Sequence, residues 1–259
     1  MFGIYKNMAK TNEELNIAAA EEMAENTAVD VDITLFKEMA ENGVLYGHKK
    51  SKTQPKFKPF IFTTRNGMEI IDLAKTLESV DKVSEFLNKL VKEKKAVLLV
   101  GTKPASWEAL AKMSKTFNFP MIKNRWIGGL LTNFKNIYSR IEWFRKTTVD
   151  LEKGALDKYT KKERVMVSKQ LDKMKIIFEG LDNFTRVPDA MLIVDTTVKA
   201  HDTALREAAI MKIPVIAIID SDDNPEKVQY PIPANDHSKL SINWIIDRLI
   251  ASAEQSKEI

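Results

Sequence analysis

The sequence predicts an α/β protein whose doubly wound parallel sheet carries an inserted antiparallel helical hairpin. Short continuous apolar runs alternate with amphipathic helical patterns along most of the chain, which is typical of parallel strands that helices cover on both faces. This alternation stops between the strand near Met121 and the run that begins at Ala190, where two helical patterns follow each other. Two consecutive helices within an alternating pattern predict an insertion that projects from the α/β body.

Three apolar runs mark the strands of the predicted sheet. They are "AVLLVG" at 96–101, "AMLIVD" at 190–195 and "PVIAIID" at 214–220. Strands that are buried on both faces have continuous apolar runs of this length. Around these runs, apolar residues recur every three or four positions, so one side of each segment can face the sheet as a helix. The helical patterns lie at 77–91, 104–118, 197–212 and 238–252.

Two apolar repeats, with alternating spacings of three and four residues, predict that the hairpin is a coiled coil. Thr160 and Glu163 have the spacing of a capping box, which places the start of the second helix there. Gly154 lies in the polar link between the helices. The repeats are Phe134, Ile137, Ile141 and Phe144 in the first helix, and Val167, Leu171, Met174, Phe178 and Leu181 in the second.

The stretch "RWIGGLLTNF" forms the root of the predicted hairpin. Gly128 and Gly129 have no side chain, so the chain can turn sharply there or approach another backbone closely. Thr132 or Asn133 can cap the first helix by accepting a hydrogen bond from one of its free N–H groups. The indole of Trp126 is more typical of packing at this root than of stacking on a base.

The charges divide the chain into three parts. Residues 1–42 contain 3 Lys/Arg and 9 Asp/Glu, residues 43–146 contain 21 and 8, and residues 147–259 contain 16 and 19. We expect the acidic N-terminus to be a flexible tail or a docking element for a basic neighbour. The expected organisation is an N-terminal extension at 1–32, an α/β domain at 33–130 and 184–259, and the hairpin at 131–183.

The composition excludes several classes of protein. No apolar run approaches the roughly 20 residues that span a bilayer, and the N-terminus does not have the layout of a signal peptide. We therefore expect a cytoplasmic protein without a membrane partner. Because the chain has no cysteine, disulfides, zinc fingers and thiol nucleophiles are excluded.

The middle part of the chain is basic enough to bind a polyanion. Between Gly43 and Asn66, six cations are interleaved with aromatic residues and no acid is present, a composition typical of nucleic-acid binding. A solvated basic loop is the alternative, but a second basic block at 123–146 favours the polyanion. His48 suits a phosphate or base contact, and a structural imidazole is an equal alternative. The six cations are Lys49, Lys50, Lys52, Lys56, Lys58 and Arg65.

Asp195 and Asp220 end two predicted strands, where ligands bind in doubly wound folds. They could form a magnesium-dependent phosphoryl-transfer pair, although an acid at the end of a strand more often forms a turn or caps a helix. No Walker phosphate loop and no Gly-x-Gly-x-x-Gly motif follows any strand. We therefore expect no catalytic residue, no cofactor and no metal ligand. A nucleotide-binding enzyme and a coiled-coil interaction scaffold are the alternatives.

Seven blocks of the chain carry a resemblance to a known family. They are "GVLYGHKKSKTQPKFKPFIFTTRNGMEIIDLAKT", "VGTK", "NRWIGGLLTNFKNI", "TKKER", "PDAMLIVD", "IPVIAIIDSDDNP" and "YPIPAND". Their order and spacing resemble those of the bacterial-type small-subunit (30S) ribosomal protein two, or S-two, family. The resemblance extends from about Ile33 to Leu249. One departure is Leu45, where the family usually has a histidine, and this departure leaves open whether His48 shares a metal or base contact.

The resemblance implies a structural protein without catalytic activity. It implies a flavodoxin-like three-layer α/β/α fold and a place in the small ribosomal subunit, between head and body. The expected partners are 16S rRNA, neighbouring small-subunit proteins and, in many bacteria, ribosomal protein one. No homo-oligomer is expected.

The expected RNA contacts follow from charge and from the resemblance together. Lysine offers phosphate a point charge and arginine offers a two-pronged donor. Pro55 and Pro59 should stiffen the segment 49–60, which we expect to gain its order from RNA. The predicted RNA-binding residues are His48, Lys49, Lys50, Lys56, Lys58, Arg65, Asn66, Lys123, Asn124, Arg125, Thr132, Asn133, Lys135 and Arg140.

Overall fold

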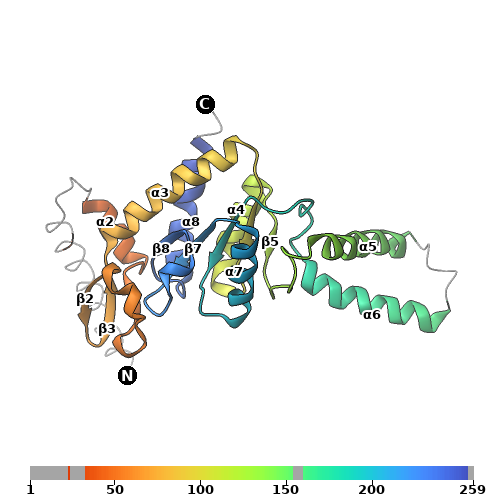
Figure 1. Ribbon diagram of the computed structural model, residues 1–259, viewed down its shortest axis with the longest axis horizontal. Helices are drawn as coiled ribbons and strands as arrows, with labels where there is room; N and C mark the ends of the chain where they lie inside the picture. Colours follow the sequence, from red (N-terminus) through yellow and green to blue (C-terminus); the bar gives the residue numbers. More distant parts are fainter. Residues whose placement is uncertain (1–22, 24–32, 154–159, 256–259) are drawn as a thin grey trace, which may run out of the picture.

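A five-stranded parallel sheet forms the centre of the structure, a computed structural model that describes Met23 and residues 33–153 and 160–255 (Figure 1). The strand order is β5-β4-β6-β7-β8. In order along the chain this is 2-1-3-4-5, the flavodoxin-like arrangement, so the predicted fold class is confirmed. The strands are β4 (Val97–Val100), β5 (Met121–Ile122), β6 (Ala190–Val194), β7 (Val215–Ile219) and β8 (Tyr230–Pro233).

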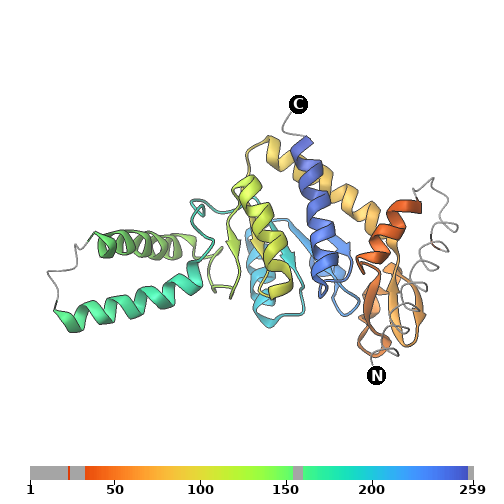
Figure 2. The ribbon, with the colours of Figure 1, turned by 180° about the vertical axis from the view of Figure 1, so that it is seen from behind.

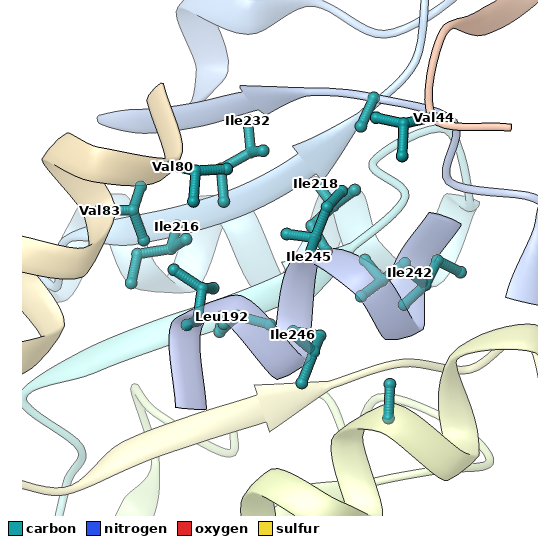
Figure 3. Close-up of a cluster of buried hydrophobic side chains, with 14 of the residues drawn as sticks. Val44, Val80, Val83, Leu192, Ile216, Ile218, Ile232, Ile242, Ile245 and Ile246 are labelled. Carbon is teal, nitrogen blue, oxygen red and sulfur yellow. The ribbon is translucent and has the colours of Figure 1, made fainter. Parts of the chain in front are cut away.

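Helices cover both faces of this sheet. Figure 2 shows α4 and α8 in front of it, and Figure 1 shows α7 in front of the opposite face. Alternate strand residues supply two separate cores, because successive side chains of a strand point to opposite faces. Figure 3 shows the core on the α3 and α8 side, with Leu192, Ile216 and Ile218 among its residues. The helices are α3 (Leu73–Lys92), α4 (Pro104–Phe117), α7 (Lys199–Met211) and α8 (Lys239–Gln255).

Strand β8 was not among the predicted strands. It contains Pro231 and Pro233, which cannot donate hydrogen bonds to a neighbouring strand. The structure accommodates them because β8 lies at the edge of the sheet and pairs only with β7.

A second, three-stranded antiparallel sheet, which the sequence analysis did not predict, lies on both sides of the segment 49–60 along the chain. Its order is β1-β3-β2, and two short 3₁₀ helices lie between β1 and β2. Phe57 is fully buried in the same core cluster as Leu98 and Val100 of the central sheet, so the segment 49–60 is anchored to the protein, in contrast to the expectation that RNA orders it. The elements are α2 (Ile33–Glu41), β1 (Tyr46–Lys49), η1 (Lys50–Lys52), η2 (Pro55–Phe60), β2 (Ile61–Arg65), β3 (Met68–Ile71) and, further along the chain, η4 (Pro225–Lys227).

Helices α5 (Phe134–Glu152) and α6 (Lys161–Phe178) extend side by side away from the sheet (Figures 1 and 2). We call this pair the hairpin. The predicted capping box is confirmed, because the Thr160 hydroxyl accepts from the Glu163 N–H and the Glu163 carboxylate accepts from the Thr160 N–H. Of the residues predicted to pack inside the hairpin, Ile137, Ile141, Leu171, Phe178 and Leu181 are buried.

The predicted side-chain cap of α5 is wrong. Asn133 is its N-cap residue, but it makes no capping hydrogen bond. With φ at −119° and ψ at 41°, Asn133 does not have the extended backbone that normally lets a cap side chain reach the first turn. Its amide oxygen accepts from Asn136 instead.

Two predicted features fall on residues that the structure does not describe. They are the extension at 1–32, apart from Met23, and Gly154 in the link between the hairpin helices. Among the described residues, no helix combines the length and the apolar composition that crossing a lipid bilayer requires.

Gly180 closes the open edge of β5 as the chain leaves the hairpin. Its carbonyl accepts a hydrogen bond from the Met121 N–H at 2.7 Å, and its φ is +87°. A Cβ at this position would lie 2.5 Å from the Met121 carbonyl oxygen. Both the backbone conformation and the close approach therefore require glycine.

We predict that Gly180→Ala destabilises the protein more than Gly67→Ala does. Gly67 also has a positive φ, at +75°, but a Cβ there would meet nothing within 4 Å. Both substitutions impose a left-handed conformation on alanine at roughly 1 kcal/mol, whereas only Gly180→Ala displaces a backbone carbonyl, at a further cost of about 1–3 kcal/mol. Urea unfolding of the two variants measures the difference, and equal midpoints would contradict the close approach.

Candidate nucleic-acid interface

One end of the three-stranded sheet gathers four of the predicted RNA-binding residues. Lys49 of β1 and Arg65 of β2 both lie opposite Met68 of the central strand, so they flank it in one row. The Lys50 N–H donates to the Gly67 carbonyl at 3.0 Å, which brings Lys50 beside the β2–β3 turn. The turn contains Asn66, with φ at +50°. We call Lys49, Lys50, Arg65 and Asn66 the sheet-end cluster.

Lys56 and Lys58 lie on η2, on either side of the buried Phe57 ring. Both lysines are exposed, but Lys56 forms an ion pair with Glu226 of η4. Lys58 forms no ion pair with any residue that the structure describes. The buried Phe57 ring therefore holds the segment that carries both lysines. Lys58 is the more available of the two for an RNA phosphate, because Lys56 is already paired with Glu226.

His48 is oriented by carboxylates at the carboxyl end of β7. Its Nδ1 lies 2.8 Å from Asp220 and 3.4 Å from Asp222. The hydrogen bond with Asp220 raises the pKa of His48 against the opposing effect of burial, and the charge of Asp222 adds to this. β1 can come this close to Ser221 because Gly47 has no side chain. A Cβ on Gly47 would lie only 2.9 Å from the Ser221 hydroxyl. Only Nε2 of His48 is left for a contact with RNA.

Buried carboxylates gather at the carboxyl ends of β6, β7 and β8, and the sequence analysis singled out only Asp195 and Asp220 among them. Burial, followed by the charge of Asp236, raises the pKa of Asp223 to about 8. Burial also raises the pKa of Asp236 well above its usual value. Asp223 is therefore mostly protonated at neutral pH.

Two overlapping sets of side chains in this region could hold a metal ion. They are His48, Asp220 and His237, and Asp195, Asp236 and His237, with ligand atoms within 4.8 Å of one another in each set. Imidazole and carboxylate groups suit zinc and related divalent ions. The sequence analysis expected no metal ligand, and these residues come from four separate segments of the chain.

Asp195 and Asp220, the candidate phosphoryl-transfer pair, are both engaged with other protein groups. Asp195 forms an ion pair with Lys103, and one of its oxygens accepts from the Thr197 N–H at 2.7 Å. That hydrogen bond makes Asp195 the turn residue before α7, which is the commoner role of an acid at the end of a strand. Asp220 is paired with His48.

The hairpin root is held by a buried carboxylate that sequence reasoning missed. Glu207 of α7 is 6% exposed. One of its oxygens accepts from the Trp126 indole at 3.0 Å and the Gly129 N–H at 2.8 Å. The other accepts from the N–H groups of Leu131 at 3.0 Å and Thr132 at 3.3 Å. Burial alone would raise the pKa of Glu207, but these hydrogen bonds hold it below its usual value.

The root explains two features of the sequence. Gly129 has φ at +84°, a conformation that turns its N–H toward the carboxylate and that glycine adopts readily. Trp126 is 4% exposed and donates to Glu207, so the prediction that it packs at the root is confirmed. For Gly128, a Cβ would meet nothing within 4 Å, so only one of the two glycines is required by this geometry.

Most of the other predicted RNA-binding residues near the root contact the protein itself. Lys123 pairs with Glu179 at 3.2 Å, and the Asn124 amide donates to the Ile176 carbonyl at 2.7 Å. Thr132 donates to Glu207, and Asn133 accepts from Asn136. Three exposed cations have no ion pair with the described residues, and these are Arg125, Lys135 and Arg140.

The predicted RNA-binding residues do not form one patch. Figures 1 and 2 show β2 and β3 at one end of the longest axis and the hairpin at the other. The central sheet lies between them. The structure therefore presents two separate cationic surfaces rather than the continuous one that the basic middle of the sequence suggests.

Comparisons with known proteins place this architecture in one family. A sequence model described as ribosomal protein S2 matches residues 39–256. Three similar proteins are each named small ribosomal subunit protein uS2. The chain is 37% identical over 228 residues to the protein of Petrotoga mobilis, with 88% of this chain and 78% of that protein covered. It is 36% identical over 226 residues to the protein of Coprothermobacter proteolyticus, with 87% of this chain and 84% of that protein covered. It is 37% identical over 225 residues to the protein of Dictyoglomus turgidum, with 87% of this chain and 91% of that protein covered.

We predict that Glu207→Gln lowers the free energy of unfolding at pH 7 by about 2–3 kcal/mol, because the amide group leaves buried N–H donors without an acceptor. The folded-state pKa of Glu207 lies below its unfolded value. Its contribution is therefore present above that unfolded value and is lost as the pH falls through the folded one. The gap between parent and variant should therefore begin to narrow as the pH falls below the usual pKa of a glutamate, about 4.3.

Urea unfolding between pH 3 and pH 8 measures this gap. Glu254→Gln, at an exposed position of α8, is the matched control and should change stability by less than about 0.5 kcal/mol. A Glu207→Gln variant as stable as the control at pH 7 would contradict the proposed anchor.

Proposed function

Since this chain belongs to the ribosomal protein S2 family, we infer that it is a structural protein of the small ribosomal subunit and not an enzyme. As a component of that subunit it works in the bacterial cytoplasm. We propose further that it binds 16S rRNA between the head and the body of the subunit. Its contacts are made by two cationic surfaces on a rigid α/β body.

The sheet-end cluster is the observation that carries this proposal. Lys49 and Lys50 are exposed, and the ladder of the small sheet fixes their spacing from Arg65. Cations held on a fixed framework lose little conformational freedom when they bind phosphates. Since A-form RNA hides its major groove, contacts of this kind go mainly to phosphates and 2′-hydroxyl groups.

The separation of the two surfaces supports a position between two parts of the rRNA. The sheet-end cluster and the exposed cations Arg125, Lys135 and Arg140 lie toward opposite ends of the molecule (Figures 1 and 2). One short RNA helix cannot follow both surfaces across the intervening sheet. We therefore propose that each surface binds a different rRNA segment, and that the protein holds these segments at a fixed separation.

Contacts with other proteins form a second part of the proposal. Neighbouring small-subunit proteins are expected partners of any component of this particle. A role in docking ribosomal protein one is supported only by the resemblance of the sequence blocks to the S-two family. We propose that the chain does not assemble with further copies of itself.

A phosphoryl-transfer enzyme is the main rival, and the site does not favour it. Asp195 forms an ion pair with Lys103 and accepts a hydrogen bond from Thr197, and Asp220 is paired with His48. A magnesium ion that bridged these two acids would have to displace those partners. A coiled-coil scaffold that binds another protein is the other rival. Its binding would not depend on salt and it would have no affinity for RNA, whereas RNA binding weakens as the salt concentration rises.

We predict that Lys49→Ala, Lys50→Ala and Lys58→Ala together reduce the magnitude of the salt slope of 16S rRNA binding by about 3, because each phosphate-bound lysine contributes roughly 1. The slope is that of the logarithm of affinity against the logarithm of salt concentration. Filter binding of the full chain to a 16S rRNA transcript, from 50 to 300 mM salt, measures it.

Exposed lysines on α3 provide the control. Lys82→Ala, Lys89→Ala and Lys92→Ala remove the same charge from the part of α3 that leads away from the small sheet (Figure 1). This variant should keep a slope close to that of the parent. If both triple variants change the slope equally, binding depends on net charge alone and the sheet-end surface is not an RNA contact.

A further inference from the structure

A groove lies between the small sheet and the carboxyl end of the central sheet. It has a volume of about 430 Å³ and is lined by residues of β1, η1 and β3 and of the segments that follow β7 and β8. Tyr46 and Met68 give it apolar surface, and Lys49 and Lys52 give it two cations. Lys52 is not among the predicted RNA-binding residues, so the contacts discussed so far leave its charge without a role.

The cations of this groove are available to a ligand. Lys49 and Lys52 are exposed, and neither forms an ion pair with the described residues. Asp220 also lines the groove, but it is already paired with His48. The lining therefore fits a ligand that carries both carboxylates and apolar side chains.

The chain itself contains a segment of this composition. Residues 13–22, "EELNIAAAEE", include four glutamates and no cation, with Leu15 and Ile17 between the acids. They lie outside the described residues, in the part of the chain that precedes α2. Residues 13–32 contain seven acids and no cation, whereas residues 43–66 contain six cations and no acid. Two segments of opposite charge thus lie on either side of one short helix, and they attract each other.

Met23 holds the end of this acidic segment to the body of the protein. Its side chain is 1% exposed and belongs to the core cluster that also contains Phe36 of α2 and Ile70 of β3. Met23 precedes α2 by ten residues, and Figures 1 and 2 show α2 and the small sheet at the same end of the molecule. Ten residues of extended chain span about 33 Å, roughly twice the length of a strand in the small sheet. Residues 13–22 therefore start from a buried anchor and are long enough to extend across this end.

We propose that residues 13–22 dock in this groove and compete there with RNA phosphates. Their glutamates neutralise Lys49 and Lys52, and their aliphatic side chains pack against the apolar lining. The docking itself stands on the groove and on the charges, whereas the competition with RNA rests on the proposed function.

The docked state is reversible. Exposed ion pairs are individually weak, but a tethered segment meets its site at an effective concentration in the millimolar range. An RNA that contacts only the small sheet has to displace the segment for a small return. An rRNA that engages both cationic surfaces displaces it more readily, because the second surface supplies further contacts. The segment therefore lowers the affinity for short, unrelated RNA more than the affinity for the full rRNA site.

The chain's own segment is favoured over a separate acidic protein because it is present at the groove in every molecule, without a loss of translational freedom on binding. The family model begins only at residue 39. Residues 13–22 thus lie outside the matched region, and the docking is proposed for this chain alone.

Crosslinking of the full chain without RNA tests the docking. The chain has no cysteine, so Asn16→Cys and Ser51→Cys place one thiol in the segment and one at an exposed position of η1. A short bismaleimide should join them within one chain, at a rate that does not depend on protein concentration. High salt should slow the reaction, because it screens the ion pairs. Asn16→Cys with Ser139→Cys, at an exposed position of the hairpin, is the matched control and should react about tenfold more slowly.

The competition is tested with a segment variant that loses four negative charges. Its affinity for a 16S rRNA transcript should rise about threefold to tenfold, the gain expected if the segment covers the groove in about two thirds to nine tenths of the free molecules. The control variant loses the same charge from α3 and its C-cap and should stay within about twofold of the parent. The segment variant carries Glu13→Gln, Glu14→Gln, Glu21→Gln and Glu22→Gln. The control variant carries Glu78→Gln, Asp81→Asn, Glu85→Gln and Glu93→Gln, all at exposed positions.

The outcomes separate this proposal from the proposed function. A crosslink that forms no faster than that of the control pair, or that forms only between two chains, overturns the docking. Equal rRNA affinities of the segment variant and the control variant overturn the competition. A parent chain without salt-dependent rRNA affinity overturns the proposed function and the competition with it, whereas the crosslink, which is measured without RNA, still decides the docking.

Discussion

The buried carboxylate of Glu207 fixes the direction in which the hairpin leaves the α/β body. A buried charge without a cationic partner is unfavourable unless hydrogen bonds replace its hydration. Here the indole of Trp126 and the backbone N–H groups of the root loop supply them. Because these donors converge on one residue of α7, the loop cannot rotate without leaving the carboxylate unsatisfied. The direction of the loop from which α5 begins follows from this site.

A fixed hairpin gives the two cationic surfaces a defined separation. The sheet-end cluster belongs to a small antiparallel sheet, which is joined to the central sheet where His48 and Asp220 meet. The hairpin is joined to the other end through Glu207. Between them lies a parallel sheet that is buried on both faces. If each surface binds RNA as proposed, little conformational freedom of the protein is lost on binding, because both surfaces are already ordered.

Local sequence patterns predicted the central strands, the capping box and a sharp turn at Gly128 and Gly129 because each depends on neighbouring residues. They also predicted the packing of Trp126. Strand β8 was missed because Pro231 and Pro233 argue against a strand unless its place at the sheet edge is known. Glu207 was missed for a different reason. An acid in a helical pattern normally faces solvent, and the donors to Glu207 lie 75 to 81 residues away in the sequence. The acidic cluster likewise forms only when separate strands meet.

The most direct test of a hairpin held by Glu207 is a distance measurement in the free protein. The chain contains no cysteine, so spin labels can be attached through Lys89→Cys on α3 and Lys146→Cys on α5, both at exposed positions. Pulsed electron paramagnetic resonance should give one narrow distance distribution that 16S rRNA leaves unchanged and that Glu207→Gln broadens. A broad distribution in the free parent chain that narrows only when rRNA binds would show that RNA, rather than Glu207, sets the direction of the hairpin.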